Sequence, residues 1–214
     1  MINSRSITPE TPDNFLDLSY ADVDVLFESG EIIKEGKTQD VRLCRIQGKT
    51  LIVKCYRAQG LLSAFRILIR LSRPHKSLRY SYLLRKRGIA CPAHYLVVAR
   101  NTLRYARTFL LIERVAGPNL YDFLYSKDPL TLSEKTAQAA IHTIKSLHSL
   151  GFTHGDLHAQ NIVVKNETTV QLIDLDNVRK NRRRQEKDIA RFKKSVEDGT
   201  QNREILLEKI NAQL

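Results

Sequence analysis

The sequence contains little cysteine, has no long apolar run and lacks acidic residues altogether across its central part. Its three cysteines, Cys44, Cys55 and Cys91, show no Cys-x-x-Cys spacing, which argues against a disulfide or zinc framework and favours buried thiols in a reducing compartment. No window approaches the roughly eighteen apolar residues of a transmembrane helix, and the polar start MINSRSITPETPDN has no secretory apolar core. We therefore expect a soluble, intracellular chain.

The composition is that of a folded globular protein. The 214 residues are 42% hydrophobic and 27% charged, which excludes a disordered or fibrous chain. No internal repeat or low-complexity tract is present. This length is enough to bury a core in one large domain or in a compact two-lobed one.

The charges are segregated along the chain. Thirty-five Lys and Arg against 23 Asp and Glu give a net charge of +12, yet residues 41–112 hold 16 basic residues and no acid. Residues 177–196 hold nine basic residues against two acids, whereas the first forty residues hold nine acids against three bases. Such segregation indicates a polyanionic partner (nucleic acid, anionic lipid headgroups or a phosphorylated substrate) or a solvated basic face.

Hydrophobic periodicity divides the chain into three parts. Residues 1–30 read as a loosely attached lead-in with a short helix at 21–27, residues 31–115 as a β-rich lobe, and residues 116–214 as a helical lobe. Strands are expected at 31–34, 41–46, 50–56, 95–99 and 108–113, with Gln47 in a hairpin break. Helices are expected at 61–73, 76–87 and 137–150, with Pro74 separating the first two.

The residues that carry chemistry follow the last of these helices. The sequence HGDLHAQN at 154–161 leads into an apolar strand, a polar turn at 166–169, a second strand and the acids of LIDLD at 172–176. A hairpin would return Asp174 to Asn161, with Asp156 on the loop entering the first strand. These oxygen ligands suit Mg²⁺, and Asp156 is equally placed to orient or deprotonate a hydroxyl nucleophile.

Candidate nucleotide-binding residues lie upstream. Lys54 ends an apolar strand, where its ammonium could hold phosphates, and Gly36 lies in a turn whose amides could cover them. A single glycine without GxGxxG is a weak signal. The segment from Glu113 to Val115 closes an apolar strand before Gly117, where a connector between lobes could bind adenine through its backbone.

Lys54, HGDLHAQN and IDLD at 173–176 together resemble the protein-kinase-like fold. More narrowly, the chain resembles the bacterial kinases that phosphorylate heptose or Kdo in the lipopolysaccharide core, over about residues 30–196. The supporting stretches are LIVKCYRAQGLLSAF, RNTLRYARTFLLIERVAG, HGDLHAQNIVV and LIDLDNVRKNRRRQEKDIARF.

The resemblance implies an α+β, two-lobed kinase-like fold with a small β-rich N-terminal lobe and a reduced helical C-terminal lobe. It implies Asp156 as catalytic base, Asn161 and Asp174 as Mg²⁺ ligands, Lys54 as the ATP phosphate contact and His154 as a support of the loop. The expected acceptor is a heptose or Kdo hydroxyl of a lipid-linked anionic sugar, at the cytoplasmic face of the inner membrane, with peripheral contact to anionic lipid. Two alternatives stay open, a small atypical Ser/Thr protein kinase bound to RNA and a pseudokinase that binds a membrane or partner.

Two features depart from the pattern of that family, and the two histidines raise the question of a zinc site. Residues 55–112 contain no acid to pair with Lys54, so Asp174 or an acid of the first forty residues would take that place. Asp176 stands where the motif DFG has glycine. His154 and His158 have no third nitrogen or sulfur ligand nearby in sequence, which disfavours zinc.

The segment 61–73, drawn as one helix, gathers its basic and apolar side chains on opposite faces. The basic set is Arg66, Arg70 and Arg73, and the apolar set is Leu61, Leu62, Phe65, Leu68 and Ile69. Packing of the apolar face on the lobe and docking of that face on a membrane are equally good interpretations.

Overall fold

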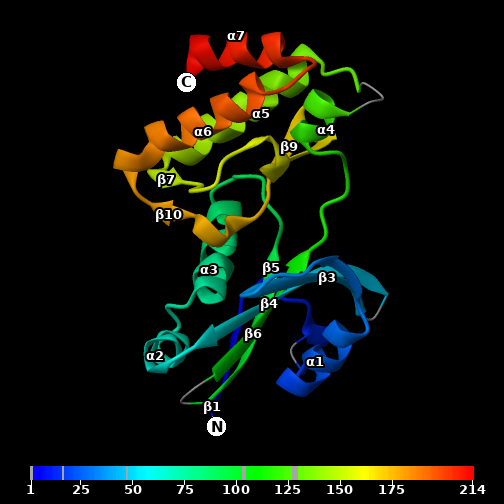
Figure 1. The fold of residues 1–214 in the computed structure, drawn as a ribbon, viewed down its shortest axis with the longest axis vertical. Coiled ribbons are helices and arrows are strands. Elements are labelled where there is room, and N and C mark those ends of the chain that lie inside the picture. The colour runs from blue at the N-terminus through cyan, green and yellow to red at the C-terminus, as the bar shows by residue number, and fades with distance from the viewer. Residues whose placement is uncertain (1, 16, 47, 103–104, 127–129) are drawn as a thin grey trace. The chain divides into compact units, whose positions relative to one another are not determined.

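The computed structural model describes residues 2–15, 17–46, 48–102, 105–126 and 130–214, and these divide into two compact units. Unit 1 comprises Met1–Leu83 and Pro92–Arg114, and unit 2 comprises Leu84–Cys91 and Val115–Leu214 (Figure 1). The chain passes from unit 1 to unit 2 between Arg114 and Val115, inside the segment expected to connect two lobes. None of the helices in the described ranges is long and apolar enough to cross a membrane.

Unit 1 is built on a six-stranded antiparallel sheet. Its order is β1-β5-β6-β4-β3-β2, with bounds Ile2–Ile7, His94–Asn101, Tyr105–Glu113, Lys49–Gln59, Gln39–Ile46 and Glu31–Lys34. The five predicted strands are present, most of them longer than expected, while Gln47 of the predicted break lies outside the described residues.

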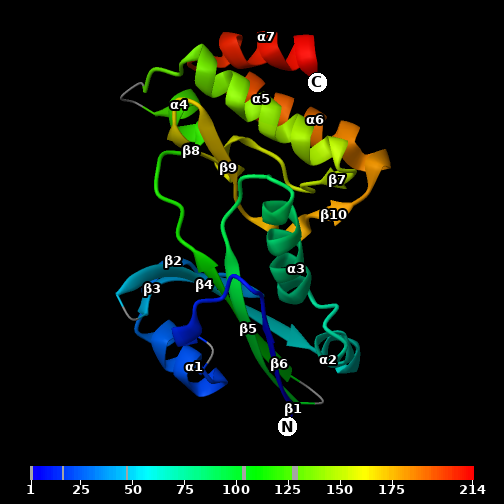
Figure 2. The ribbon, with the colours of Figure 1, turned by 180° about the vertical axis from the view of Figure 1, so that it is seen from behind.

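Strand β1 was not predicted. It pairs with β5 along its whole length, from Ile2 opposite Asn101 to Ile7 opposite Leu96 (Figure 2). The helix expected at 21–27 is α1 (Tyr20–Glu28), which follows the short η1 (Asp13–Phe15) and packs on the sheet. The first thirty residues are therefore integral to unit 1, whereas the sequence analysis expected a loosely attached lead-in.

The two faces of this sheet follow the alternation of its side chains. One face packs against α1 through Phe27, with Val53 and Cys55 of β4 among the buried residues. The opposite face packs Tyr56 of β4 against Leu78 of α3 (Arg73–Lys86). Because side chains alternate along a strand, Lys54 lies on this second face, on the side of α3. The three cysteines are buried and free, as expected.

The helical segment after β4 is interrupted. Helix α2 ends at Leu68 (Leu61–Leu68), Arg70 has a left-handed φ of 56°, and α3 begins at Arg73. Pro74 therefore lies in the first turn of α3 instead of separating two helices. Proline is favoured there because its missing N–H would have no intrahelical partner and its φ is already helical. The single helix assumed for 61–73 is wrong.

Unit 2 combines helices with two small two-stranded sheets. Helix α4 (Leu120–Tyr125) precedes α5 (Glu134–Ser149), whose Ser133 caps it by accepting the N–H of Thr136. Strands β8 (Ile162–Asn166) and β9 (Thr169–Leu172) form the predicted hairpin, and β7 (Phe152–Thr153) pairs with β10 (Arg179–Lys180). Three 3-10 turns and two further helices, α6 (Gln185–Glu197) and α7 (Arg203–Gln213), complete unit 2, and neither of these two helices was predicted. The 3-10 turns of unit 2 are η2 (Ala159–Asn161), η3 (Leu175–Asn177) and η4 (Arg182–Arg184).

Candidate active site

The loop that carries Asp156 leaves β7 through a turn that only glycine fits. Gly155 has a left-handed φ of +80°, and a Cβ built on it would stand 2.5 Å from the carbonyl oxygen of Asn177. L-residues with a side chain rarely adopt this conformation. The glycine of HGD is therefore required both by the turn and by the close approach of the segment 175–177.

Asp188 of α6 holds the same loop from the other side. Its carboxylate accepts the N–H of His154 at 2.5 Å and that of Gly155 at 2.9 Å, and it lies 3.4 Å from Nε2 of His148. Burial acts to raise the pKa of Asp188, but these hydrogen bonds outweigh it and leave the pKa below its usual value. Asp188 is therefore a charged, fully enclosed acceptor for the loop backbone.

His154 forms the second support. Its side chain is completely buried, and Nε2 lies 2.8 Å from the carbonyl oxygen of Ile173, to which it donates. Burial lowers the pKa of His154, so the ring is neutral and its Nδ1 carries no proton. The ring thus links the loop to the residue that precedes Asp174.

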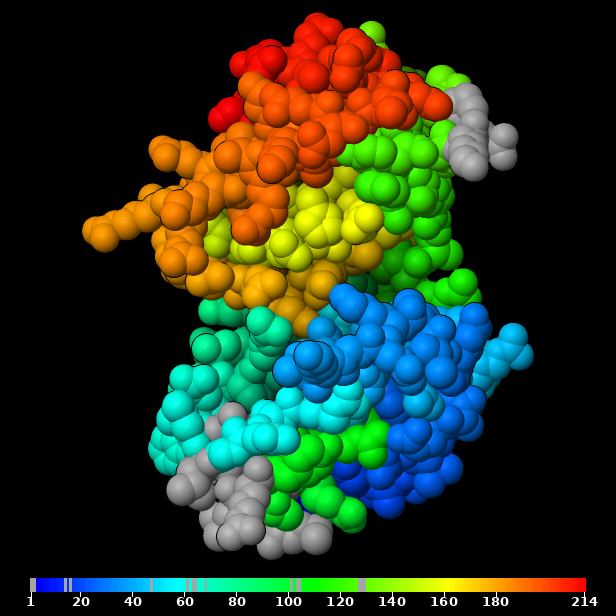
Figure 3. Space-filling model, viewed as in Figure 1, coloured from blue at the N-terminus to red at the C-terminus, as the bar shows by residue number. Residues whose placement is uncertain are grey.

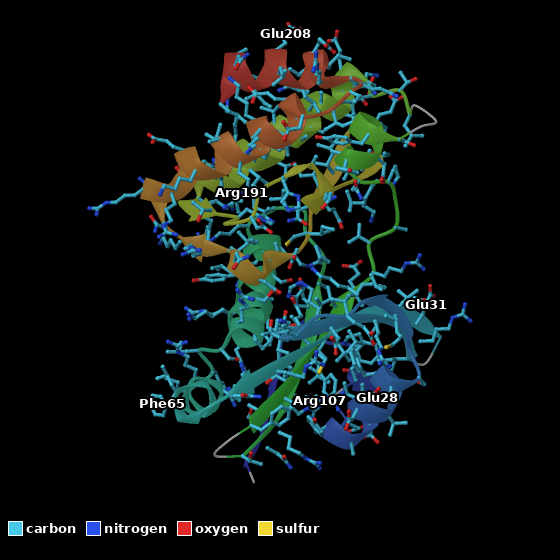
Figure 4. The ribbon with its side chains drawn as sticks, in the orientation of Figure 1. Glu28, Glu31, Phe65, Arg107, Arg191 and Glu208 are labelled. Atoms are coloured by element: carbon cyan, nitrogen blue, oxygen red, sulfur yellow. The ribbon has the colours of Figure 1, made fainter. Side chains whose placement is uncertain are left out.

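The carboxylate of Asp156 lies between two nitrogen groups. Oδ2 is 3.6 Å from Nε2 of His158, and Oδ1 is 3.6 Å from a guanidinium nitrogen of Arg191. Figure 4 labels Arg191 on α6. Arg191 also donates to the carbonyl oxygen of Gly155. The side chain of Asp156 is 40% exposed, so its carboxylate is accessible to a substrate hydroxyl.

Asn161 and Asp174 are brought together through the backbone. The N–H of Ile173 donates to the carbonyl oxygen of Asn161 at 2.9 Å, which joins the two ends of the hairpin. The side-chain Nδ2 of Asn161 donates to the carbonyl oxygen of Asp156 at 2.8 Å. Asp174 follows with left-handed backbone angles of φ 57° and ψ 62°, a conformation that aspartate tolerates and that is common at functional sites.

These residues fit a magnesium ion. Since Nδ2 of Asn161 is the atom that donates, Oδ1 is the atom left to accept, and no hydrogen bond among the described residues occupies it. Within the described ranges, no group of three or more His, Cys, Asp or Glu side chains is placed to hold a metal. Two protein oxygens, with phosphate oxygens and water completing the shell, are what Mg²⁺ requires, whereas zinc requires more protein ligands.

The candidate nucleotide-binding residues lie mainly in unit 1. Lys54 is 8% exposed and stands in β4 between Val41 of β3 and Leu110 of β6. Glu113, at the end of β6, exchanges two hydrogen bonds with Ala93, one through its backbone N–H and one through Oε2, both of 2.8 Å. Val115 is the first residue of the second part of unit 2.

Gly36 lies in the turn between β2 and β3, and its amide has a protein partner. The N–H donates to Oδ1 of Asp40 at 3.0 Å, while the carbonyl oxygen accepts from Arg57, which also pairs with Asp40. A phosphate that used this amide would have to replace Asp40. The clamp formed by Asp40 and Arg57 was not anticipated from the sequence.

Two residues of α6, Asp188 and Arg191, were also missed as parts of the site. The sequence contains a signal for Asp188, because Asp188, Phe192 and Val196 recur every four residues along one face of a helix, and all three are buried. An acid on the apolar stripe of a helix calls for a buried partner. The many basic residues around α6 favoured an interpretation of this segment as an anion-binding surface, so its buried acid was not identified.

A basic surface belongs to the same unit as Asp156. It consists of exposed side chains from β10 to the start of α6: Arg179, Lys180, Arg182, Arg183, Arg184 and Lys187. Figure 3 shows this orange segment at the surface of unit 2. No ion pair joins these side chains to a carboxylate of the described residues, so the surface is free to meet an anion.

Comparisons with known proteins identify a family. The model of the "Lipopolysaccharide kinase (Kdo/WaaP) family" matches residues 24–211. Lipopolysaccharide core heptose(II) kinase WaaY of Escherichia coli (strain K12) is 36% identical over 95 residues, which are 44% of this chain and 38% of WaaY. Maternal embryonic leucine zipper kinase of Xenopus laevis is 29% identical over 70 residues, 32% of this chain and 11% of that protein. The matched stretches thus span 38% or less of each of these relatives.

Proposed function

Because the chain belongs to the lipopolysaccharide kinase (Kdo/WaaP) family, we propose that it transfers the γ-phosphoryl group of ATP to a heptose or Kdo hydroxyl of the lipopolysaccharide core. The observation that carries the proposal is the loop 154–161. It presents the accessible carboxylate of Asp156 and is fixed by Asp188 and His154, and a backbone hydrogen bond joins Asn161 to Ile173, the residue before Asp174.

In this proposal Asp156 accepts the proton of the acceptor hydroxyl as that oxygen attacks the phosphoryl group. Arg191 and His158 hold the carboxylate in position from either side. Lys54 binds the phosphates, and the backbone from Glu113 to Val115 binds adenine. The amide of Gly36, which donates to Asp40, would bind a phosphate only by exchanging that carboxylate for it. Bound at Asn161 and Asp174, Mg²⁺ would neutralise phosphate charge.

The acceptor is proposed to be anionic and carried by a membrane lipid. The basic surface from Arg179 to Lys187 supports this, because it belongs to the unit that holds Asp156 and its side chains are exposed. Phosphate or carboxylate groups on a core sugar would match this surface in charge. We propose that the reaction takes place at the cytoplasmic face of the inner membrane.

The test is phosphorylation of core oligosaccharide isolated from cells that lack this protein. With ATP and Mg²⁺, the purified chain should add one phosphoryl group per oligosaccharide, measured by mass spectrometry. Asp156→Asn should lower the rate by about 10²–10⁴-fold, since it removes the base. Glu208→Gln, an exposed change on α7 of the same unit, is the control and should leave the rate unaltered.

Three outcomes would replace the proposal. Phosphate transfer to protein but never to oligosaccharide would identify a protein kinase. Absence of Mg²⁺-dependent ATP binding in a thermal-shift assay would identify a pseudokinase. ATP binding with no transfer to a heptose- or Kdo-containing oligosaccharide would show that the acceptor class is wrong.

A further inference from the structure

Helix α2 turns most of its described apolar side chains to solvent. Leu62 is 64% exposed, Phe65 56% and Ile69, just beyond the helix, 42%. The residue that packs on the sheet is Ile67, which is 4% exposed and lies against Ala99 and Ala106. Core packing therefore does not explain the apolar side chains of Leu62, Phe65 and Ile69. The side chains of Leu61 and Leu68, which belong to the same predicted apolar set, lie outside the described ones.

The apolar side chains continue past the end of the helix. Leu71 is 49% exposed, so four large apolar side chains are exposed between residues 62 and 71. Figure 4 labels Phe65 at the outer edge of unit 1, and Figures 1 and 2 both show α2 beyond the end of β4. A cluster of this kind on a surface indicates an interaction site. We call Leu62, Phe65, Ile69 and Leu71 the apolar ridge.

A basic pocket lies directly beside the ridge. It has a volume of about 190 Å³ and lies between the ends of β3 and β4, α2 and the start of α3. Its charged and hydroxyl-bearing lining residues are Thr38, Tyr56, Arg57, Arg66, Ser72, Arg73 and Thr108. The pocket contains three guanidinium groups and no carboxylate lines it, which makes it complementary to a phosphate.

Two of the three guanidinium groups are available to a ligand. Arg57 is engaged by Asp40, whereas neither Arg66 nor Arg73 forms an ion pair with a described carboxylate. Both side chains are exposed, and no acid occurs between residues 41 and 112 to neutralise them. The pocket is therefore positively charged in the folded unit.

We propose that the apolar ridge and this pocket form a docking site for an anionic phospholipid of a bilayer. The phosphate of the headgroup enters the pocket between Arg66 and Arg73, while the ridge enters the boundary between headgroups and acyl chains. Exposed apolar side chains next to unpaired basic ones are the composition of a segment that lies in a membrane interface. A soluble protein partner would match the ridge but would leave the basic pocket beside it unexplained.

The experiment is co-sedimentation of the full chain with vesicles. Vesicles of phosphatidylcholine with phosphatidylglycerol should bind the chain, vesicles of phosphatidylcholine alone should bind it weakly, and raised salt should weaken binding. Since each basic residue near an anionic surface contributes about 1 kcal/mol, Arg66→Gln and Arg73→Gln should each lower the partition coefficient about fivefold. Phe65→Ser should lower it about tenfold.

Two matched controls separate docking from general adsorption. Lys165→Gln removes an exposed charge from β8 of unit 2. Val25→Ser removes an apolar side chain from α1, where Val25 is 71% exposed. Both should bind vesicles like the unaltered chain. If either weakens binding as much as its counterpart in the pocket or ridge, or if the Arg66→Gln, Arg73→Gln double variant still binds fully, the docking site is refuted. Circular dichroism of each variant checks the fold.

The inference stands apart from the phosphotransfer proposal. Asp156→Asn should bind vesicles as well as the unaltered chain while losing transfer to core oligosaccharide. A chain that phosphorylates oligosaccharide but ignores anionic vesicles would refute docking alone. A chain that binds the vesicles through Arg66 and Arg73 but transfers no phosphate would refute the proposed reaction alone. Inorganic phosphate should release the chain no more than sodium chloride of the same ionic strength does, whereas release specific to phosphate would show a soluble-anion site.

Discussion

At the scale of single residues, the carboxylate of Asp188 is 2% exposed and accepts hydrogen bonds from two successive backbone N–H groups. Asp188→Asn removes the charge and part of this acceptor capacity, so we expect the free energy of unfolding to fall by about 2–3 kcal/mol. Urea denaturation measures it. Glu186→Gln, an exposed change two residues earlier in α6, should alter the value by less than about 0.5 kcal/mol. Equal effects of the two changes would contradict the assigned role.

The difference in unfolding free energy between the unaltered chain and Asp188→Asn should depend on pH. The pKa of Asp188 is lowered in the folded chain by its hydrogen bonds, so its contribution to stability is complete above the ordinary carboxyl pKa near 4 and is lost as the pH falls through the lowered value. The gap in unfolding free energy between the unaltered chain and Asp188→Asn should therefore shrink as the pH drops below about 4. A gap that grew on acidification would contradict this account.

Gly155 offers a second test at this scale because Gly88 provides a matched control. Both have positive φ values, of +80° and +79°, but a Cβ on Gly88 would meet no atom within 4 Å, whereas on Gly155 it would meet Asn177. Gly88→Ala should cost about 1–2 kcal/mol for backbone strain alone. Gly155→Ala should cost at least about 1 kcal/mol more, because the segment 175–177 must move, and it should also lower the transfer rate. Thermal or urea unfolding of both variants measures the two losses of stability.

At the scale of elements, α6 serves as the support of the loop 154–161. Asp188, Arg191 and Ser195 follow at spacings of three and four residues and so share one face of the helix. Asp188 accepts from His154 and Gly155, Arg191 donates to Gly155, and Ser195 accepts the N–H of Ala159 at 3.1 Å. One helix face thus fixes the loop at its beginning and at the turn that precedes Asn161.

Arg191 is a positioning residue in this arrangement, and its role predicts a particular kinetic pattern. Arg191→Met keeps the aliphatic stem but removes the group that lies 3.6 Å from Asp156, so kcat should fall about tenfold while the KM for ATP stays unchanged. Arg191→Lys should restore part of the rate. Steady-state kinetics with core oligosaccharide measures both. A change in the KM for ATP with kcat unaltered would place Arg191 in nucleotide binding instead.

The same elements show what the sequence could predict. The hairpin β8–β9 was predictable because its two apolar runs and the polar turn between them are local signals, and they bring Asn161 to the segment of Asp174. Strand β1 was not, since Arg5 and three serines or asparagines make it polar and only its pairing with β5 defines it. The clamp of Gly36 by Asp40 and Arg57 depends on the register of β3 against β4, which no local pattern contains.

At the scale of the whole molecule, the charge segregation is partly resolved by folding. The acids of the first forty residues pair with bases of the acid-free stretch: Asp24 and Glu28 with Arg107, Glu28 with Arg42, and Asp40 with Arg57. Arg107 also lies over the ring of Phe109 at 4.9 Å. The acidic start thus neutralises one side of unit 1, while the bases at α2 and at β10 to α6 keep their charge for anionic ligands.

This pairing predicts how unit 1 responds to acid and salt. The hydrogen bond from Arg57 lowers the pKa of Asp40, so the stabilisation is present above the ordinary carboxyl pKa near 4 and is lost as the pH falls through the lowered value. Asp40→Asn should lower the free energy of unfolding by about 1 kcal/mol at pH 7, this effect should shrink as the pH falls below about 4, and about 1 M salt should reduce it. Glu35→Gln, an exposed carboxylate in the same turn, should have no such dependence. If Asp40→Asn and Glu35→Gln had the same free energy of unfolding at every pH, the pairing of Asp40 with Arg57 would not stabilise the fold. The acids would then serve only to reduce the net charge.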